Sequence, residues 1–159
     1  MPEQLYDRTS GVCAVEALDP RLLASLLARA ERDSLGDVAG KATASVQTRS
    51  VPRRRPGRFS LGRAAGPHET LTAAVLLPLH LLVVVADLET ERVVAQSGRL
   101  DDMTVEQDLP QLTIDTGVSV FTRWSNGTEA ASLHVALGDD PAGNAFKEQL
   151  REAVRDANS

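Results

Sequence analysis

This sequence of 159 residues has little of what disulfide-bonded, metal-binding or membrane-spanning proteins need. Cys13 is its one cysteine, so it can form neither an intramolecular disulfide nor a cysteine metal cluster. Its longest apolar stretch, residues 71–86, falls short of the about 20 residues of a membrane helix and contains Pro78 and His80. The polar N-terminus lacks the basic and apolar regions of a signal peptide. We therefore expect no transmembrane segment and a cytoplasmic location, with peripheral membrane attachment as an alternative.

Common catalytic motifs are also missing from the sequence. It contains no Gly-x-Ser-x-Gly elbow, no Walker loop and no Gly-x-Gly-x-x-Gly loop. His68, His80 and His134 fall in different predicted elements, without the short spacing that metal ligands show. The acidic pairs 101–102 and 139–140 are interpreted as a turn and a helix cap. We therefore name no catalytic, cofactor or metal residue and expect a protein that is not an enzyme.

Lysine is scarce, and the basic residues are unevenly distributed. The chain has 15 arginines and two lysines, which with its abundant alanine suggests a bacterial protein. The formal net charge is −5, yet residues 41–68 contain seven basic side chains and no acidic one. Such segregation concerns partners rather than fold, and it points to an anionic ligand or surface.

An amphipathic helix is predicted in the N-terminal segment, residues 1–36. Asp19 and Pro20 supply an N-cap and a first helical residue, and Gly36 is the expected stop, so the helix covers about residues 19–34. Four leucines define its apolar face: Leu22, Leu23, Leu26 and Leu27. This face is a candidate interaction helix, although packing on the chain's own sheet is favoured over docking on a partner.

The main domain, residues 41–157, is predicted to contain seven strands and a closing helix. The strands are expected at residues 41–51, 70–77, 79–86, 92–97, 103–107, 117–124 and 130–137. Asn126–Gly127 predicts a tight hairpin, because both residues tolerate positive φ. The helix, at about residues 140–156, has an apolar stripe of Ala142, Phe146, Leu150, Ala153 and Ala157. The predicted class is α+β, a curled antiparallel sheet with a helix over its open end.

From Lys41 to Asp156 the chain resembles bacterial pleckstrin-homology-like (PH-like) domains of poorly defined function. The likeness is carried by the hairpin 76–85, the strand 93–96, the stretch 99–105, and the segment 130–137 that leads into the helix. It implies a seven-stranded antiparallel barrel capped by a C-terminal helix, with the N-terminal amphipathic helix as an addition. It also implies a binding or scaffolding module. The apolar turn at residues 77–79 departs from the polar turn usual in such domains.

Two functions follow from these observations. The first is a protein-binding or scaffolding module that contacts an unknown protein or a second copy through a strand edge, the N-terminal helix or both. The second is peripheral binding of an anionic lipid or phosphate. In lipid-binding PH domains basic residues in the first inter-strand loop hold headgroups, and here that loop holds the candidates Arg49, Arg53, Arg54, Arg55, Arg58 and Arg63. Nucleic acid is disfavoured, because Phe59 is the loop's one aromatic residue.

Overall fold

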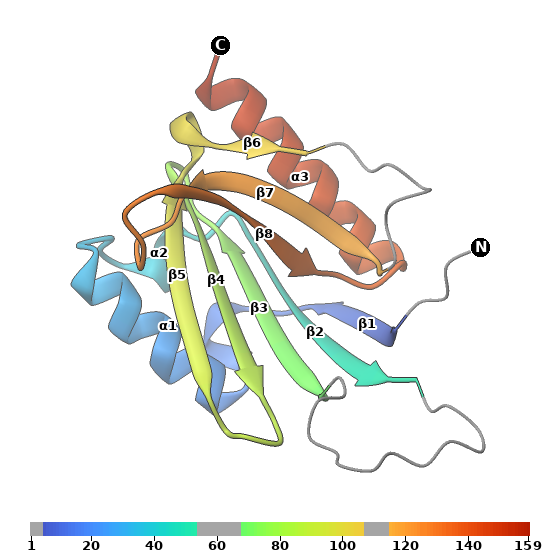
Figure 1. The fold of residues 1–159 in the computed structure, drawn as a ribbon. Coiled ribbons are helices and arrows are strands. Elements are labelled where there is room, and N and C mark those ends of the chain that lie inside the picture. Colours follow the sequence, from blue (N-terminus) through green and yellow to red (C-terminus); the bar gives the residue numbers. More distant parts are fainter. Residues whose placement is uncertain (1–4, 54–67, 107–114) are drawn as a thin grey trace.

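In the described residues, eight strands in two antiparallel sheets and a C-terminal helix make up the α+β fold (Figure 1). The computed structural model describes residues 5–53, 68–106 and 115–159. The first sheet has the order β1-β2-β3-β4-β5, with β1 Tyr6–Val12, β2 Ala44–Pro52, β3 Thr70–Leu76, β4 His80–Asp87 and β5 Val93–Arg99. The second has the order β6-β7-β8, with β6 Thr104–Val105, β7 Gly117–Arg123 and β8 Ala130–Ala136.

Two longer helices accompany the sheets. α1, Pro20–Arg32, begins at the predicted cap, since the Asp19 carboxylate accepts a hydrogen bond from the Arg21 amide. α3, Pro141–Ala157, begins in the same way at Asp140. The short elements are α2 Val38–Lys41 and the 3-10 turns η1 Val15–Ala17 and η2 Leu100–Asp102. No helix in the described part of the chain is long and apolar enough to cross a membrane.

The core has two layers, one on each face of the five-stranded sheet. One layer fills the space between this sheet, the three-stranded sheet and α3, and includes Val83, Val120 and Phe146. The other lies under α1, where Leu22 and Leu26 are fully buried against Val84 and its neighbours. The α1 leucine face therefore packs on the chain's own sheet, as the sequence favoured, and Figure 1 shows this helix on the side away from the second sheet.

The seven expected strands are all present, but the fold differs from the expected barrel in two ways. β1 was not predicted, and it joins β2 along its whole length, from Tyr6 opposite Pro52 to Val12 opposite Val46. The described strands also form two separate sheets instead of one closed barrel. The N-terminal segment thus contributes a strand to the main sheet as well as a helix.

One local prediction was wrong. Neither Asn126 nor Gly127 has a positive φ. The β7–β8 connection is a longer loop in which the Gly127 amide donates to the Trp124 carbonyl (3.0 Å), so the tight hairpin does not form. On α3 the predicted stripe packs against the core, with Phe146 and Leu150 buried and Ala142, Ala153 and Ala157 partly buried. Gly143 and Val154 are buried there as well, and the sequence did not identify them.

Candidate functional site

β8 is an edge strand of the three-stranded sheet, and no described strand pairs with its outer side. Glu106 donates its amide to the Ser119 carbonyl (2.8 Å), so the Ser119 main chain faces β6. The residue opposite Ser119 on β8 is His134, so the main-chain groups of His134 also point away from β7. The direction of main-chain groups alternates along a strand. The amides and carbonyls of Ala130 and Ser132 therefore point away from β7, toward the open side.

The side chains of β8 suit the approach of another strand. Residues 130–136 contain no proline and no Asp, Glu, Lys or Arg. Ala130, Ala131 and Ser132 are exposed, and Leu133 is half-buried at the rim of the inter-sheet core. Natural edge strands usually carry a charge, a proline or a bulge that prevents pairing with other chains. None of these protections occurs between Ala130 and Ala136.

The edge of β1, at the other side of the larger sheet, is closed by carboxylates. Asp115 Oδ1 accepts hydrogen bonds from the amides of Leu5 (2.9 Å) and Tyr6 (3.1 Å). Asp140 Oδ2 accepts from the amide of Ser10 (2.9 Å). These side chains occupy main-chain donors that an added strand would need, so β1 is a poor docking edge.

The edge of β5 is closed at one end by the loop after β7. Ser97 and Ser125 exchange hydrogen bonds, from the Ser97 amide to Ser125 Oγ (2.9 Å) and from the Ser125 amide to the Ser97 carbonyl (2.9 Å). Ser97 Oγ also donates to Asp33 Oδ2 (2.7 Å), and Asp33 forms a two-pronged ion pair with Arg29. Burial opposes ionisation of Asp33, but the hydrogen bonds from Arg29 and Ser97 outweigh it and lower its pKa. This network fixes the end of α1 against both sheets.

Of the predicted anion-binding arginines, the described ones already have acidic partners. Arg49 pairs with Glu69 and Arg53 with Asp7, the latter at 2.8 Å between Nε and Oδ1. The other four, Arg54, Arg55, Arg58 and Arg63, lie outside the described residues. The two ion pairs partly neutralise the base of the basic segment.

The predicted interaction helix keeps little of its apolar face available. Leu22 and Leu26 are buried under α1, Leu23 is half-buried, and Leu27 is 46% exposed. A single half-exposed leucine is ordinary on a protein surface. The structure thus separates the two surfaces proposed from the sequence, because the helix face is used internally while an edge strand remains open.

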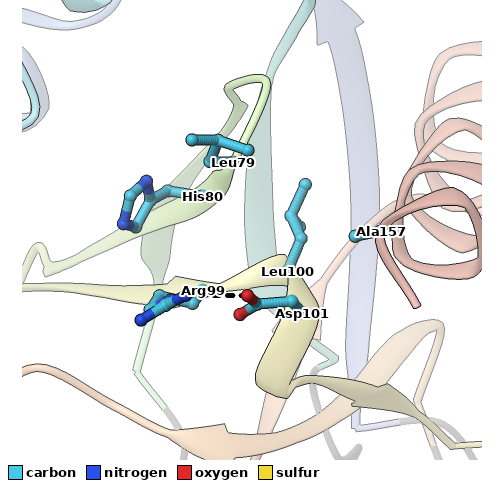
Figure 2. A pocket seen from close by; sticks show the side chains of 6 residues that line it. All are labelled: Leu79, His80, Arg99, Leu100, Asp101 and Ala157. Carbon is cyan, nitrogen blue, oxygen red and sulfur yellow. Dashed lines mark hydrogen bonds and ion pairs between the residues drawn. The ribbon is translucent and has the colours of Figure 1, made fainter.

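A small hollow of about 300 Å³ lies beside the β3–β4 turn (Figure 2). Its wall includes His80, the Arg99–Asp101 ion pair and the exposed Leu79. Burial and the neighbouring Arg99 lower the pKa of His80, which favours the neutral imidazole. Because Asp101 pairs with Arg99 at 2.7 Å, this carboxylate is not placed to orient the His80 ring. The hollow therefore offers apolar contact more than acid–base chemistry.

Sequence reasoning located the β8 strand but did not identify its edge as the open one. The distinguishing signal lies in residues that are remote in sequence from the edges they close, such as Asp140 for β1 and Ser125 for β5. No cluster of three or more potential metal ligands occurs among the described residues. Comparison of the chain with protein-family models, curated proteins and solved structures gives no match.

Proposed function

We propose that this protein is a non-enzymatic protein-binding or scaffolding module that receives an extended polypeptide segment along the edge of β8. The carrying observation is that the main-chain groups of Ala130 and Ser132 face an uncharged side of β8 with no described strand beside it, whereas β1 and part of β5 are capped by side chains. An added strand would satisfy the outward main-chain groups of Ala130 and Ser132, and side-chain contacts would give specificity. The partner is thus defined chemically as a segment able to adopt a β-strand.

A PH-like architecture is part of this proposal. The order of four strands, then three strands, then a helix from β2 to α3 supports it, with β1 as an additional edge strand. In this interpretation the barrel is split on the β8 side, and the opening is the place where a partner strand adds. The fold by itself would not specify a ligand, so the argument for function depends on the β8 edge.

The test is a selection of random linear peptides displayed on phage against the immobilised protein. The informative variant is Ser132→Pro, because the Ser132 amide faces the open side and its loss leaves the β7–β8 ladder intact. Leu27→Asp on α1 is the control. Selected peptides should bind wild type and Leu27→Asp equally and bind Ser132→Pro at least tenfold more weakly. Peptides that bind Ser132→Pro as tightly as wild type would refute strand addition at β8.

Peripheral binding to an anionic surface is the second proposal. The segregation of seven basic residues into residues 41–68 favours it. Flotation with anionic and neutral vesicles should give salt-sensitive binding to the anionic vesicles alone, and charge reversal at Arg53, Arg54 and Arg55 should abolish it. The absence of binding at low salt would remove this function.

A further inference from the structure

We infer that this protein binds a small amphiphilic carboxylate, an apolar chain with one anionic end, in a second hollow beside the β3–β4 turn. This hollow has a volume of about 400 Å³ and is lined by that turn, by the connection from α1 to α2 and by the end of α2. Leu79 and His80, both drawn in Figure 2, line it as well as the hollow beside η2. The site involves no residue of β8, so it is separate from the proposed function.

The lining of this hollow is mostly apolar, and its size is that of a small-molecule site. The apolar side chains come from two segments of the chain: Leu35, Leu77, Pro78 and Leu79. Leu35 and Leu77 are buried, while Leu79 is 70% exposed in a turn where polar residues are usual. Ligand pockets are concave and mostly apolar, with volumes from about 300 to 1,000 Å³ and a few polar groups that set orientation. An apolar chain packed against Leu79 would cover side-chain area that water now reaches.

The charge at this hollow selects an anionic end group for the ligand. Lys41 lines the hollow, and it forms no ion pair with any described residue. Two carboxylates raise the pKa of His80 in the same region, those of Asp33 and Asp101, and each is already paired with an arginine. The charge without a counter-ion at the hollow is therefore the positive charge of Lys41, which a carboxylate would neutralise.

The Lys41 ammonium is positioned by the main chain of the α1–α2 connection. Its Nζ donates to the Leu35 carbonyl oxygen at 3.3 Å, and it lies so close to Gly36 that a Cβ there would stand 2.8 Å from it. An ammonium has three donors, so two are left for a ligand. Because Leu35 and Lys41 line the same hollow, a carboxylate bound to these donors has an apolar wall beside it.

The His80 ring should respond to a charged ligand. Burial lowers the pKa of His80, and Arg99 and Lys41 lower it further. A carboxylate bound at Lys41 would bring a negative charge into the same hollow, and a nearby negative charge favours the imidazolium. The pKa of His80 should therefore rise when a carboxylate binds, and a neutral ligand should not raise it.

The test is titration of the full chain with octanoate, 1-octanol and butyrate, followed by the NMR signals of the histidine rings. Comparison with a His80→Asn variant assigns the His80 signals. Octanoate should shift them saturably, raise the pKa of His80 and leave the signals of His68 and His134 unchanged. Butyrate should bind at least tenfold more weakly than octanoate, because it buries fewer methylene groups. Octanol should leave the pKa of His80 unchanged.

Two variants with matched controls locate the site. Lys41→Gln removes the ammonium and should weaken octanoate binding at least threefold, whereas Lys147→Gln, at the chain's other lysine on α3, should bind like wild type. Leu79→Asp places a negative charge at the apolar wall and should weaken binding at least tenfold. Val12→Asp is its control, because Val12 is a similarly exposed apolar residue, on β1, and does not line the hollow.

The outcomes decide between a site and unspecific association. Absence of a saturable His80 shift with octanoate, or a Lys41→Gln variant that binds as tightly as wild type, would overturn the inference. Equal shifts at all three histidines, or an equal loss of binding in Val12→Asp, would also overturn it. If octanoate binds without raising the pKa of His80, the hollow does not hold the carboxylate and the inference fails. The peptide selection is unaffected by these outcomes, because it depends on Ser132 at the β8 edge.

Discussion

Replacement of Asp140 by alanine should destabilise the protein at two elements at once. Asp140 Oδ1 accepts from the Gly143 amide (2.8 Å) in the first turn of α3, and Oδ2 accepts from the Ser10 amide (2.9 Å) on the outer edge of β1. One carboxylate therefore caps the C-terminal helix and closes a strand edge. The substitution tests the idea that the edges of this fold are closed by individual side chains.

The magnitude follows from these two bonds. Loss of an N-cap costs about 1 kcal/mol. An unsatisfied buried amide costs roughly 1–3 kcal/mol, and the lower half of this range applies because Ser10 is half-buried and water can reach it. We expect Asp140→Ala to lower the free energy of unfolding by about 2–3 kcal/mol. In a chain of this length that corresponds to a fall in Tm of roughly 5–10 °C.

Urea unfolding followed by circular dichroism measures this change. Asp140→Asn retains one acceptor oxygen and should lose about half as much. Asp139→Ala is the matched control, because Asp139 is exposed and makes one bond of 3.3 Å, to the Asn144 side chain, so it should change stability by less than about 0.5 kcal/mol. The reasoning fails if Asp140→Ala and Asp139→Ala are equally stable.

Three further results are expected. Gly143→Ala should lower the free energy of unfolding by about 1–3 kcal/mol in thermal unfolding, despite the higher helix propensity of alanine. The reason is that the alanine Cβ would stand 2.0 Å from a main-chain carbonyl oxygen of the β8–α3 connection. Leu26→Ala should cost about 2–5 kcal/mol of unfolding free energy and Leu27→Ala under about 1, since only the first is buried; equal costs would contradict the α1 packing. The hydrogen bond to Asp87 raises the pKa of His68 above 6.5 and lowers that of Asp87 to about 2. The stability that His68 contributes should therefore be complete below pH 6.5 and decline as pH rises through its raised pKa, whereas the stability that Asp87 contributes should decline below pH 3.8. If the urea midpoint of a His68→Asn variant falls above pH 6.5 as steeply as that of wild type, this pair is excluded as the cause.

The seven strands and two long helices could be predicted from apolar runs, from alternation and from the helical spacing of apolar residues. β3 and β4 are apolar runs on either side of Pro78, and α1 repeats leucine at helical spacing. These patterns record local contact with a core. They do not record which sheet a strand joins, so the two-sheet arrangement was not predictable from them.

β1 escaped prediction because its inward side chains are polar. Arg8 Nε donates to Ser50 Oγ (2.8 Å), and Ser10 Oγ and Thr48 Oγ1 are 2.5 Å apart, so hydrogen bonds replace the apolar contacts that periodicity detects. Arg8 also lies over the Tyr6 ring, 4.8 Å from its centroid. A strand whose inner face is satisfied by polar partners has no apolar alternation to reveal it.

The C-terminal end of α1 also could not be predicted from local sequence preference alone. Gly36 was the expected stop of α1 and does have a positive φ, yet Ser34 is the first residue after the helix to adopt one. The Leu35 amide then donates to the Ala30 carbonyl (2.9 Å) and closes the last turn. A non-glycine residue takes the left-handed position here because Asp33, just before it, is held by Arg29 and Ser97. Tertiary contacts therefore override the local preference.

The lack of protection along the outer edge of β8 cannot be recognised from the sequence of β8 alone. Three exposed positions, Ala130, Ala131 and Ser132, could hold a lysine or glutamate without loss of buried apolar contact, and one such charge would block edge pairing. β1 is protected by carboxylates from distant parts of the chain, so this fold does contain the means to close an edge. The absence of such protection along β8 is the reason that we propose it as the edge that receives a partner strand.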